Sequence, residues 1–172
     1  MCYMNDKFFN GREDGMSDQG NVCYTFEGAV ELAISMEEEG FRSYLDALRK
    51  VTMKGAKEIL KEAALDELNH KHQLEKALID GYIAGESFQK PVPTMNLDYV
   101  LAKKELNANS TPQEALAFSI HLEKGAIDFY RRMASGCAGA PMGDLFERML
   151  ADESRHLQSL EDLYEEHFLT EN

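Results

Sequence analysis

Four stretches of the chain place apolar residues three or four positions apart with polar residues between them, the pattern of a helix with one buried face. Their expected extents are about 25–50, 56–84, 111–135 and 141–168. Thr25 is placed to cap the first stretch, and Thr111-Pro112-Gln113-Glu114 opens the third with a capping box and a proline at the first helical position. Helices of about 25 residues, roughly 37 Å long, suit a four-helix bundle.

The links between these stretches differ in length. Short links join the first helix to the second and the third to the fourth, so each pair should form an antiparallel hairpin. The middle link, about 85–110, is long and contains Pro91, Pro93 and a short helical pattern near 97–104. We therefore expect an all-α four-helix bundle with one long crossover between helices 2 and 3, which then run parallel. Two separate hairpins are the alternative, but they would leave apolar faces in water.

The remaining segments set the expected domain organisation. Residues 1–24 are rich in Gly, Asp, Asn and Ser and do not read as a signal peptide, so we expect an N-terminal arm. Residues 25–168 should form the bundle, followed by a tail at 169–172. No apolar run reaches the roughly 18 residues that span a bilayer, and the three cysteines form no CxxC motif. Reduced thiols and a cytoplasmic location are the expectation.

The formal net charge is −13, which argues against nucleic acid or an anionic membrane as a partner. The acidic residues either cover a solvated surface or lie partly inside, neutralised by cations. Composition alone leaves both interpretations open.

The two halves of the chain match without a gap. DELNH begins at position 66 and DESRH at position 152, 86 positions later, and at the same offset Glu37 corresponds to Glu123 and Tyr44 to Tyr130. Apolar positions also pair with apolar positions, which indicates two copies of one helical hairpin. The register with Glu123 and the spacing to Tyr44 select Glu37 over its neighbours Glu38 and Glu39.

The matched acidic residues fall within the apolar stripes. A buried unpaired carboxylate is costly, and four at one level of a bundle would repel one another, so the pattern predicts two divalent cations. On a helix, Glu and His three positions apart share a face. The donor set is that of dinuclear iron and manganese centres in helix bundles, and zinc is also compatible. The predicted metal ligands are Glu37, Glu67, His70, Glu123, Glu153 and His156.

Four more residues are candidates for supporting roles. Asp66 is placed to hold His156, and Asp152 to hold His70, because ligating imidazoles usually donate their second N–H to an acceptor. Tyr44 and Tyr130 follow Glu37 and Glu123 by seven positions, so each hydroxyl is placed to bond a ligand carboxylate or to line an oxygen pocket. The alternatives are surface aspartates and ordinary core tyrosines.

The segments MEEEGFRSY (36–44) and LEKGAIDFY (122–130), together with DELNH and DESRH, resemble the ferritin-like superfamily, and within it the rubrerythrin-type di-iron proteins. The resemblance covers about residues 25–168. It implies that the six predicted ligands bind two iron ions. Tyr44 and Tyr130 are the candidate catalytic residues because of their spacing from Glu37 and Glu123. It also implies reduction of hydrogen peroxide or dioxygen at a carboxylate-bridged dinuclear centre, with electrons from a separate donor protein, in a homodimer.

Two departures from the rubrerythrin pattern stand out. Full-length rubrerythrins carry a rubredoxin-like domain with paired CxxC motifs, which this sequence lacks, so a separate electron donor is expected. The family also tends to place an extra Glu three residues after a helix ligand, where this chain has Gly40 and Ala126. That change puts the rubrerythrin peroxidase mechanism in question. A ferroxidase or iron-handling protein, and a non-catalytic metal-stabilised scaffold, are the alternative functions.

Overall fold

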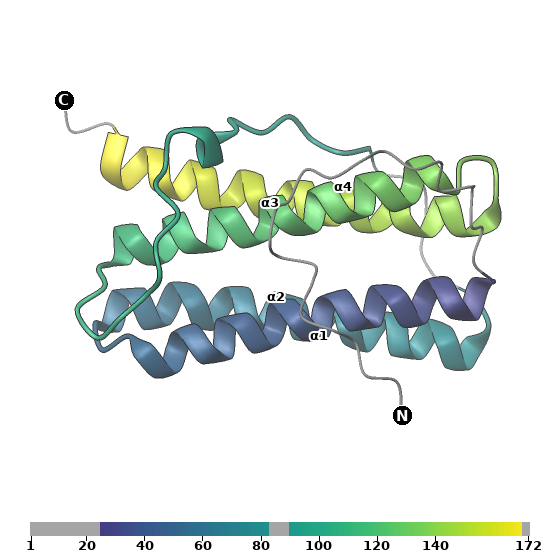
Figure 1. Cartoon of the computed structure of the whole chain (residues 1–172), viewed down its shortest axis with the longest axis horizontal. Coiled ribbons are helices and arrows are strands. Elements are labelled where there is room, and N and C mark those ends of the chain that lie inside the picture. The colour runs from purple at the N-terminus through teal and green to yellow at the C-terminus, as the bar shows by residue number, and fades with distance from the viewer. Residues whose placement is uncertain (1–24, 83–89, 170–172) are drawn as a thin grey trace, which may run out of the picture.

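Four long helices account for most of the computed structural model, which describes residues 25–82 and 90–169 (Figure 1). They are α1 (Phe26–Lys50), α2 (Lys54–Asp80), α3 (Pro112–Gly136) and α4 (Pro141–Tyr164). A 3₁₀ turn, η1 (Leu97–Tyr99), lies in the crossover, and a π turn, η2 (Glu165–Leu169), follows α4. The predicted all-α bundle is confirmed. The expected arm at 1–24 lies outside the described residues, and so does most of the expected tail.

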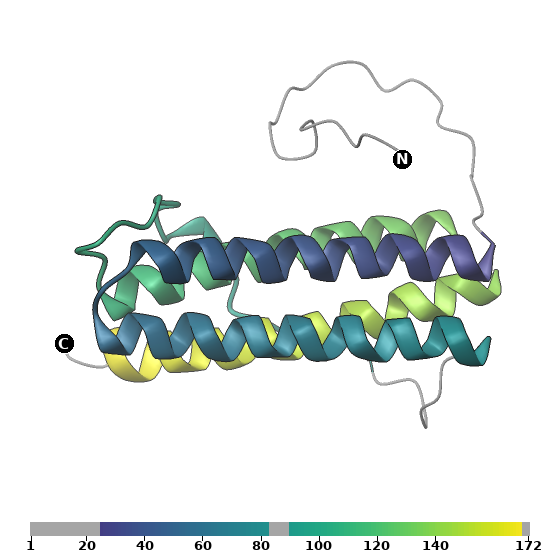
Figure 2. The ribbon, with the colours of Figure 1, turned by 90° about the horizontal axis from the view of Figure 1, so that it is seen from below.

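The helices pack as two antiparallel hairpins that face one another. α1 packs along α2, α3 packs along α4, and the hairpins meet mainly through α2 with α3 and α1 with α4. The described part of the link between α2 and α3, from residue 90 on, runs back along the bundle toward the start of α3, and α2 and α3 run parallel, as predicted (Figures 1 and 2). None of the described helices combines the length and apolarity that crossing a membrane requires.

Local chemistry explains where the helices begin. The Thr25 hydroxyl accepts a hydrogen bond from the Gly28 N–H, and Thr111 accepts one from the Glu114 N–H at 3.2 Å. The Glu114 carboxylate in turn accepts the Thr111 N–H at 3.0 Å, which completes the predicted capping box.

The end of α2 differs from the expectation. The helix ends at Asp80, before the expected position 84, because Gly81 adopts a left-handed conformation with φ of 73° and donates its N–H to the Ala77 carbonyl. Glycine takes this conformation without the steric penalty of a side chain, which makes it a common helix terminator.

Buried apolar residues form two clusters, and along the first hairpin a polar level separates them. The larger cluster draws on all four helices and includes Ala33 and Leu74, whereas the smaller one includes Tyr44 and Ala63. On α1 the buried Glu37 lies between Ala33 and Tyr44 in the sequence. The apolar packing therefore encloses this polar level from both sides along α1 and α2.

The crossover is held against α4 by two side chains. Ser154 Oγ accepts the Val92 N–H at 2.9 Å, and the fully buried Glu161 carboxylate accepts the N–H groups of Met95 at 2.5 Å and Leu97 at 2.8 Å. The helix expected near 97–104 is only the single turn η1, so that prediction was wrong in length. A carboxylate from α4, and not a run of helical hydrogen bonds, satisfies the backbone at its start.

Loss of the Glu161 carboxylate should weaken the whole bundle. We expect Glu161→Ala to lower the free energy of unfolding by about 2 kcal/mol or more, because two backbone N–H groups lose their acceptor. Urea unfolding followed by circular dichroism measures the change. Asp162→Ala, at an exposed neighbouring position, is the matched control. Equal unfolding midpoints for the two variants would contradict the anchoring role of Glu161.

Candidate metal centre

Each of the four helices contributes a buried carboxylate to one level of the bundle. The predicted ligands Glu37 and Glu153 are each 1% exposed, and Glu123 is 3% exposed. On α2, Glu67 and His70 are both 7% exposed, while His156 on α4 is half-buried. Among the described residues, these four glutamates make two ion pairs, one from Glu37 and one from Glu153, and both are with His70. Carboxylates this deeply buried require a compensating positive charge or a bound proton.

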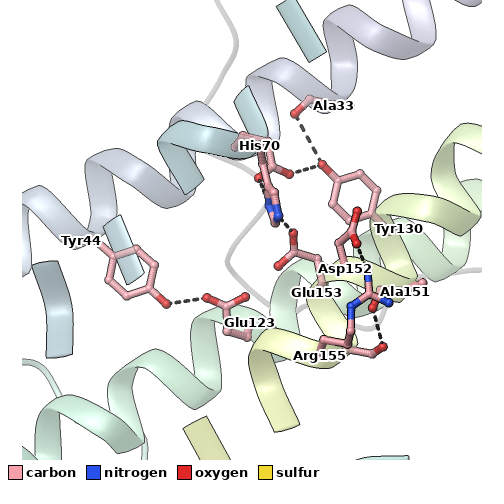
Figure 3. A network of polar contacts seen from close by, with 11 residues as sticks. Ala33, Tyr44, His70, Glu123, Tyr130, Ala151, Asp152, Glu153 and Arg155 are labelled. Carbon is pink, nitrogen blue, oxygen red and sulfur yellow. Dashed lines mark hydrogen bonds and ion pairs between the residues drawn. The ribbon is translucent and has the colours of Figure 1, made fainter. Parts of the chain in front are cut away.

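Two groups of ligand atoms converge at this level. The donor atoms of Glu37, Glu67 and His70 lie within 4.8 Å of one another, and so do those of His70, Glu153 and His156. His70 belongs to both groups, because its Nδ1 lies 3.1 Å from Oε2 of Glu37 and 3.0 Å from Oε1 of Glu153. Figure 3 shows His70 and Glu153 pointing toward one another between the two hairpins. Five of the six predicted ligands therefore meet in two overlapping groups.

The two imidazoles are parallel neighbours. The ring centroids of His70 and His156 are 4.7 Å apart and their planes differ by 3°. Both histidines follow a glutamate by three positions, which brings each Glu–His pair to the same face of its helix. The repeated spacing thus places matching donors from α2 and α4 side by side.

The sixth predicted ligand, Glu123, is held by a tyrosine from the opposite hairpin. The Tyr44 hydroxyl donates to Oε1 of Glu123 at 2.7 Å, and reciprocally the Tyr130 hydroxyl donates to Oε1 of Glu37 (Figure 3). Burial raises the pKa of both tyrosines well above the usual range, and the neighbouring carboxylate raises each further. Both hydroxyls therefore stay protonated at neutral pH and act as donors.

The two aspartates do not make the bonds expected of them. Asp66 is exposed, and Asp152 is half-buried and paired with Arg155 (Figure 3). Within the described ranges neither carboxylate is hydrogen-bonded to His70 or His156. One position along a helix is a rotation of about 100°, which turns each aspartate away from the face of the adjacent glutamate. Asp152 still acts at a distance, since its charge is one of several that raise the pKa of His70.

Electrostatics identifies the centre as a place for cations. Burial raises the pKa of Glu67 and Glu153 well above the usual range, and the charge of Glu123 is the next largest cause for both. Oε2 of Glu123 and both carboxylate oxygens of Glu153 are buried without a hydrogen bond, although Glu153 lies close to His70. Buried acceptors without partners are rare. Divalent cations fit here, because carboxylate and imidazole donors suit iron and manganese.

Two residues at the centre were not assigned a role from the sequence. Ser119 is fully buried one turn before Glu123. Its hydroxyl lowers the pKa of Tyr44, against the larger effects of burial and of the neighbouring carboxylates, which raise it. In the sequence, the feature that could have identified Ser119 is its position as a polar residue within an apolar stripe. Gly40, noted only for lacking a carboxylate, lies directly against the Glu67 side chain. No pattern along the chain reports that contact, because it joins two helices.

The raised pKa values predict how the stability of the metal-free protein depends on pH. In the unfolded chain a glutamate titrates near its ordinary value of 4.5, whereas folded Glu67 and Glu153 retain their protons to higher pH. Between these values the folded state binds more protons, so the free energy of unfolding falls as pH rises. Divalent cations replace the protons, and their stabilising effect should grow over the same range.

Thermal melts in chelator and in Mn²⁺, from about pH 5 to about pH 8, measure both trends. We expect the melting temperature in chelator to fall across the range and the Mn²⁺ effect to increase. Glu67→Gln together with Glu153→Gln should remove most of the dependence. A melting temperature in chelator that rises with pH would contradict the burial of ionisable carboxylates at the centre.

Comparison with known families gives one match. The rubrerythrin family model matches residues 114–172, which include nearly all of α3, all of α4, and three of the predicted ligands: Glu123, Glu153 and His156. Searches of curated proteins and of solved structures found no match. The first hairpin repeats the ligand pattern of the matched segment at an offset of 86 positions. Residues 114–172 therefore match the rubrerythrin family model, within a protein that has four long helices.

Proposed function

We propose that this protein is a non-haem di-iron oxidoreductase that reduces hydrogen peroxide or dioxygen, with electrons from a separate donor protein. The observation that carries the proposal is that four buried glutamates lie at one level of the bundle and that three of them, with two histidines, form two overlapping groups of ligand atoms. Three carboxylate oxygens at this level have no hydrogen-bond partner. The rubrerythrin match over the second hairpin supports iron as the metal and oxidoreduction as the chemistry.

The proposed ligands divide between two positions. Glu37, Glu67 and His70 would hold one ion. Glu153 and His156, with which His70 also groups, would hold the other. Glu123 faces both groups electrostatically, since its charge raises the pKa of Glu67 and of Glu153. Iron in these positions supplies the electrons through its change of oxidation state, which zinc lacks.

The chain itself supplies orientation and protons. Tyr44 holds Oε1 of Glu123 and Tyr130 holds Oε1 of Glu37. The other oxygen of Glu37 lies beside His70, and the other oxygen of Glu123 is buried without a hydrogen bond. Reduction of peroxide to water consumes protons as well as electrons, and each buried tyrosine holds a proton beside a ligand carboxylate. The surrounding apolar clusters limit access of bulk water to the site.

A ferroxidase or iron-handling role is the second candidate. The observation that favours it is the absence of a carboxylate at Gly40 and Ala126, which leaves a six-ligand set. Storage requires a large hollow oligomer, whereas we propose a homodimer for the oxidoreductase. Light scattering of the purified protein separates the two, because a dimer argues against storage.

The direct test is oxidation of the iron-loaded protein by peroxide. After anaerobic loading with ferrous iron, we expect rapid consumption of added peroxide, followed by absorbance between about 300 and 400 nm. Tyr44→Phe and Tyr130→Phe should each slow the reaction by roughly tenfold or more, because a ligand carboxylate loses its hydrogen bond. Tyr82→Phe, at an exposed position, is the control and should react normally.

The scaffold alternative makes the opposite prediction. If the metal only stabilises the bundle, Glu123→Ala and His156→Ala will lower the melting temperature and leave every redox assay unchanged. Iron-loaded wild-type protein that consumes neither peroxide nor dioxygen would also contradict the proposed redox function. Either result would overturn the proposed oxidoreductase.

A further inference from the structure

Gly40 lies within α1, one turn after Glu37. Glycine weakens a helix interior relative to alanine, because it loses more conformational freedom on folding. α1 is otherwise well formed, with a threonine cap at its start and basic residues in its last turn. Glycine at this position therefore needs a local explanation. The backbone conformation does not explain it, because Gly40 has ordinary helical geometry.

The reason is the Glu67 carboxylate. A Cβ atom on Gly40 would lie 2.6 Å from Oε1, 2.7 Å from Cδ and 2.9 Å from Oε2 of Glu67. Carbon atoms in good contact are about 3.5–4.0 Å apart, so the carboxylate occupies the space that a side chain at position 40 would fill. All three atoms at the tip of Glu67 lie against the α1 backbone. Alanine at this position would displace the carboxylate without breaking the helix, because the tip of Glu67 is flexible.

The second hairpin lacks this arrangement. At the 86-position offset, Gly40 corresponds to Ala126 and Glu67 to Glu153. α3 therefore carries a Cβ where α1 has none. Both oxygens of Glu153 are also fully buried without a hydrogen bond, whereas Glu67 is the more exposed of the two glutamates, at 7% against 1%. The two halves repeat the same ligands but present these two glutamates differently.

We infer that Gly40 is a positioning residue that seats the Glu67 carboxylate against α1 and makes the cation position of Glu37, Glu67 and His70 distinct from that of Glu153 and His156. The inference rests on the metal centre of the proposed function. It names a residue that makes the two cation positions of that centre unequal. A Cβ at position 40 would push Glu67 out of this seat and weaken one position while leaving the other.

Cobalt binding tests the inference without an activity assay. Calorimetric titration of the chelator-treated protein with Co²⁺ should show two ions per chain for wild type. Gly40→Ala should weaken one of the two by about 10–100-fold, as expected when the support of a metal ligand is lost, and change the visible spectrum of that ion. Gly125→Ala is the matched control, because a Cβ at this helical glycine of α3 meets nothing within 4 Å.

A double variant shows that the effect passes through Glu67. Glu67→Ala removes the carboxylate, so adding Gly40→Ala to it should cause no further loss of Co²⁺ affinity or of thermal stability. This combination should fold even if Gly40→Ala alone does not. A further loss in the double variant, or normal binding of both ions by Gly40→Ala, would overturn the role of Gly40. Failure of wild-type protein to bind Co²⁺ would instead overturn the metal centre itself.

Discussion

Four carboxylates are buried at one level of this bundle, and most other features of the structure follow from that constraint. Glu37, Glu67, Glu123 and Glu153 come from four different helices and are all nearly inaccessible to water. Their mutual repulsion in a medium of low polarity would oppose folding unless protons or cations compensate it. Burial raises the pKa of Glu67 and Glu153, which favours bound protons in the metal-free protein. The oxygens of Glu123 and Glu153 that lack hydrogen bonds are the acceptors that cations would use instead.

The repeat explains how a small chain builds such a centre. One hairpin pattern, used twice, brings matching donors to matching depths, and the exchanged hydrogen bonds from Tyr44 to Glu123 and from Tyr130 to Glu37 tie the two copies together. The symmetry is incomplete at Gly40 and Ala126, because only the first copy lacks a Cβ at this position, where the Glu67 carboxylate lies. The crossover completes the assembly, because Ser154 and Glu161 hold it against the helix that carries Glu153.

Much of this arrangement could be predicted from the sequence, because helical periodicity and capping depend on residues that are close together in the chain. The capping box at Thr111 was predicted and is present, and the burial of charged residues within apolar stripes placed Glu37 and Glu123 inside the bundle. What failed depends on contacts between elements. The turn at Leu97–Tyr99 is shorter than its pattern indicates, and its first N–H is bonded to Glu161 of α4. Asp152 pairs with Arg155 on its own helix instead of a distant imidazole. The contact between Gly40 and Glu67 has no signature in either helix alone.

We expect the six donors to hold two cations at the middle of the bundle. Anomalous diffraction from crystals of the metal-loaded protein tests it most directly, because the signal locates each ion and identifies its element. We expect two peaks per chain, both enclosed by the six predicted ligands Glu37, Glu67, His70, Glu123, Glu153 and His156. An absence of peaks at this level, or peaks only at carboxylates on the surface, would contradict it.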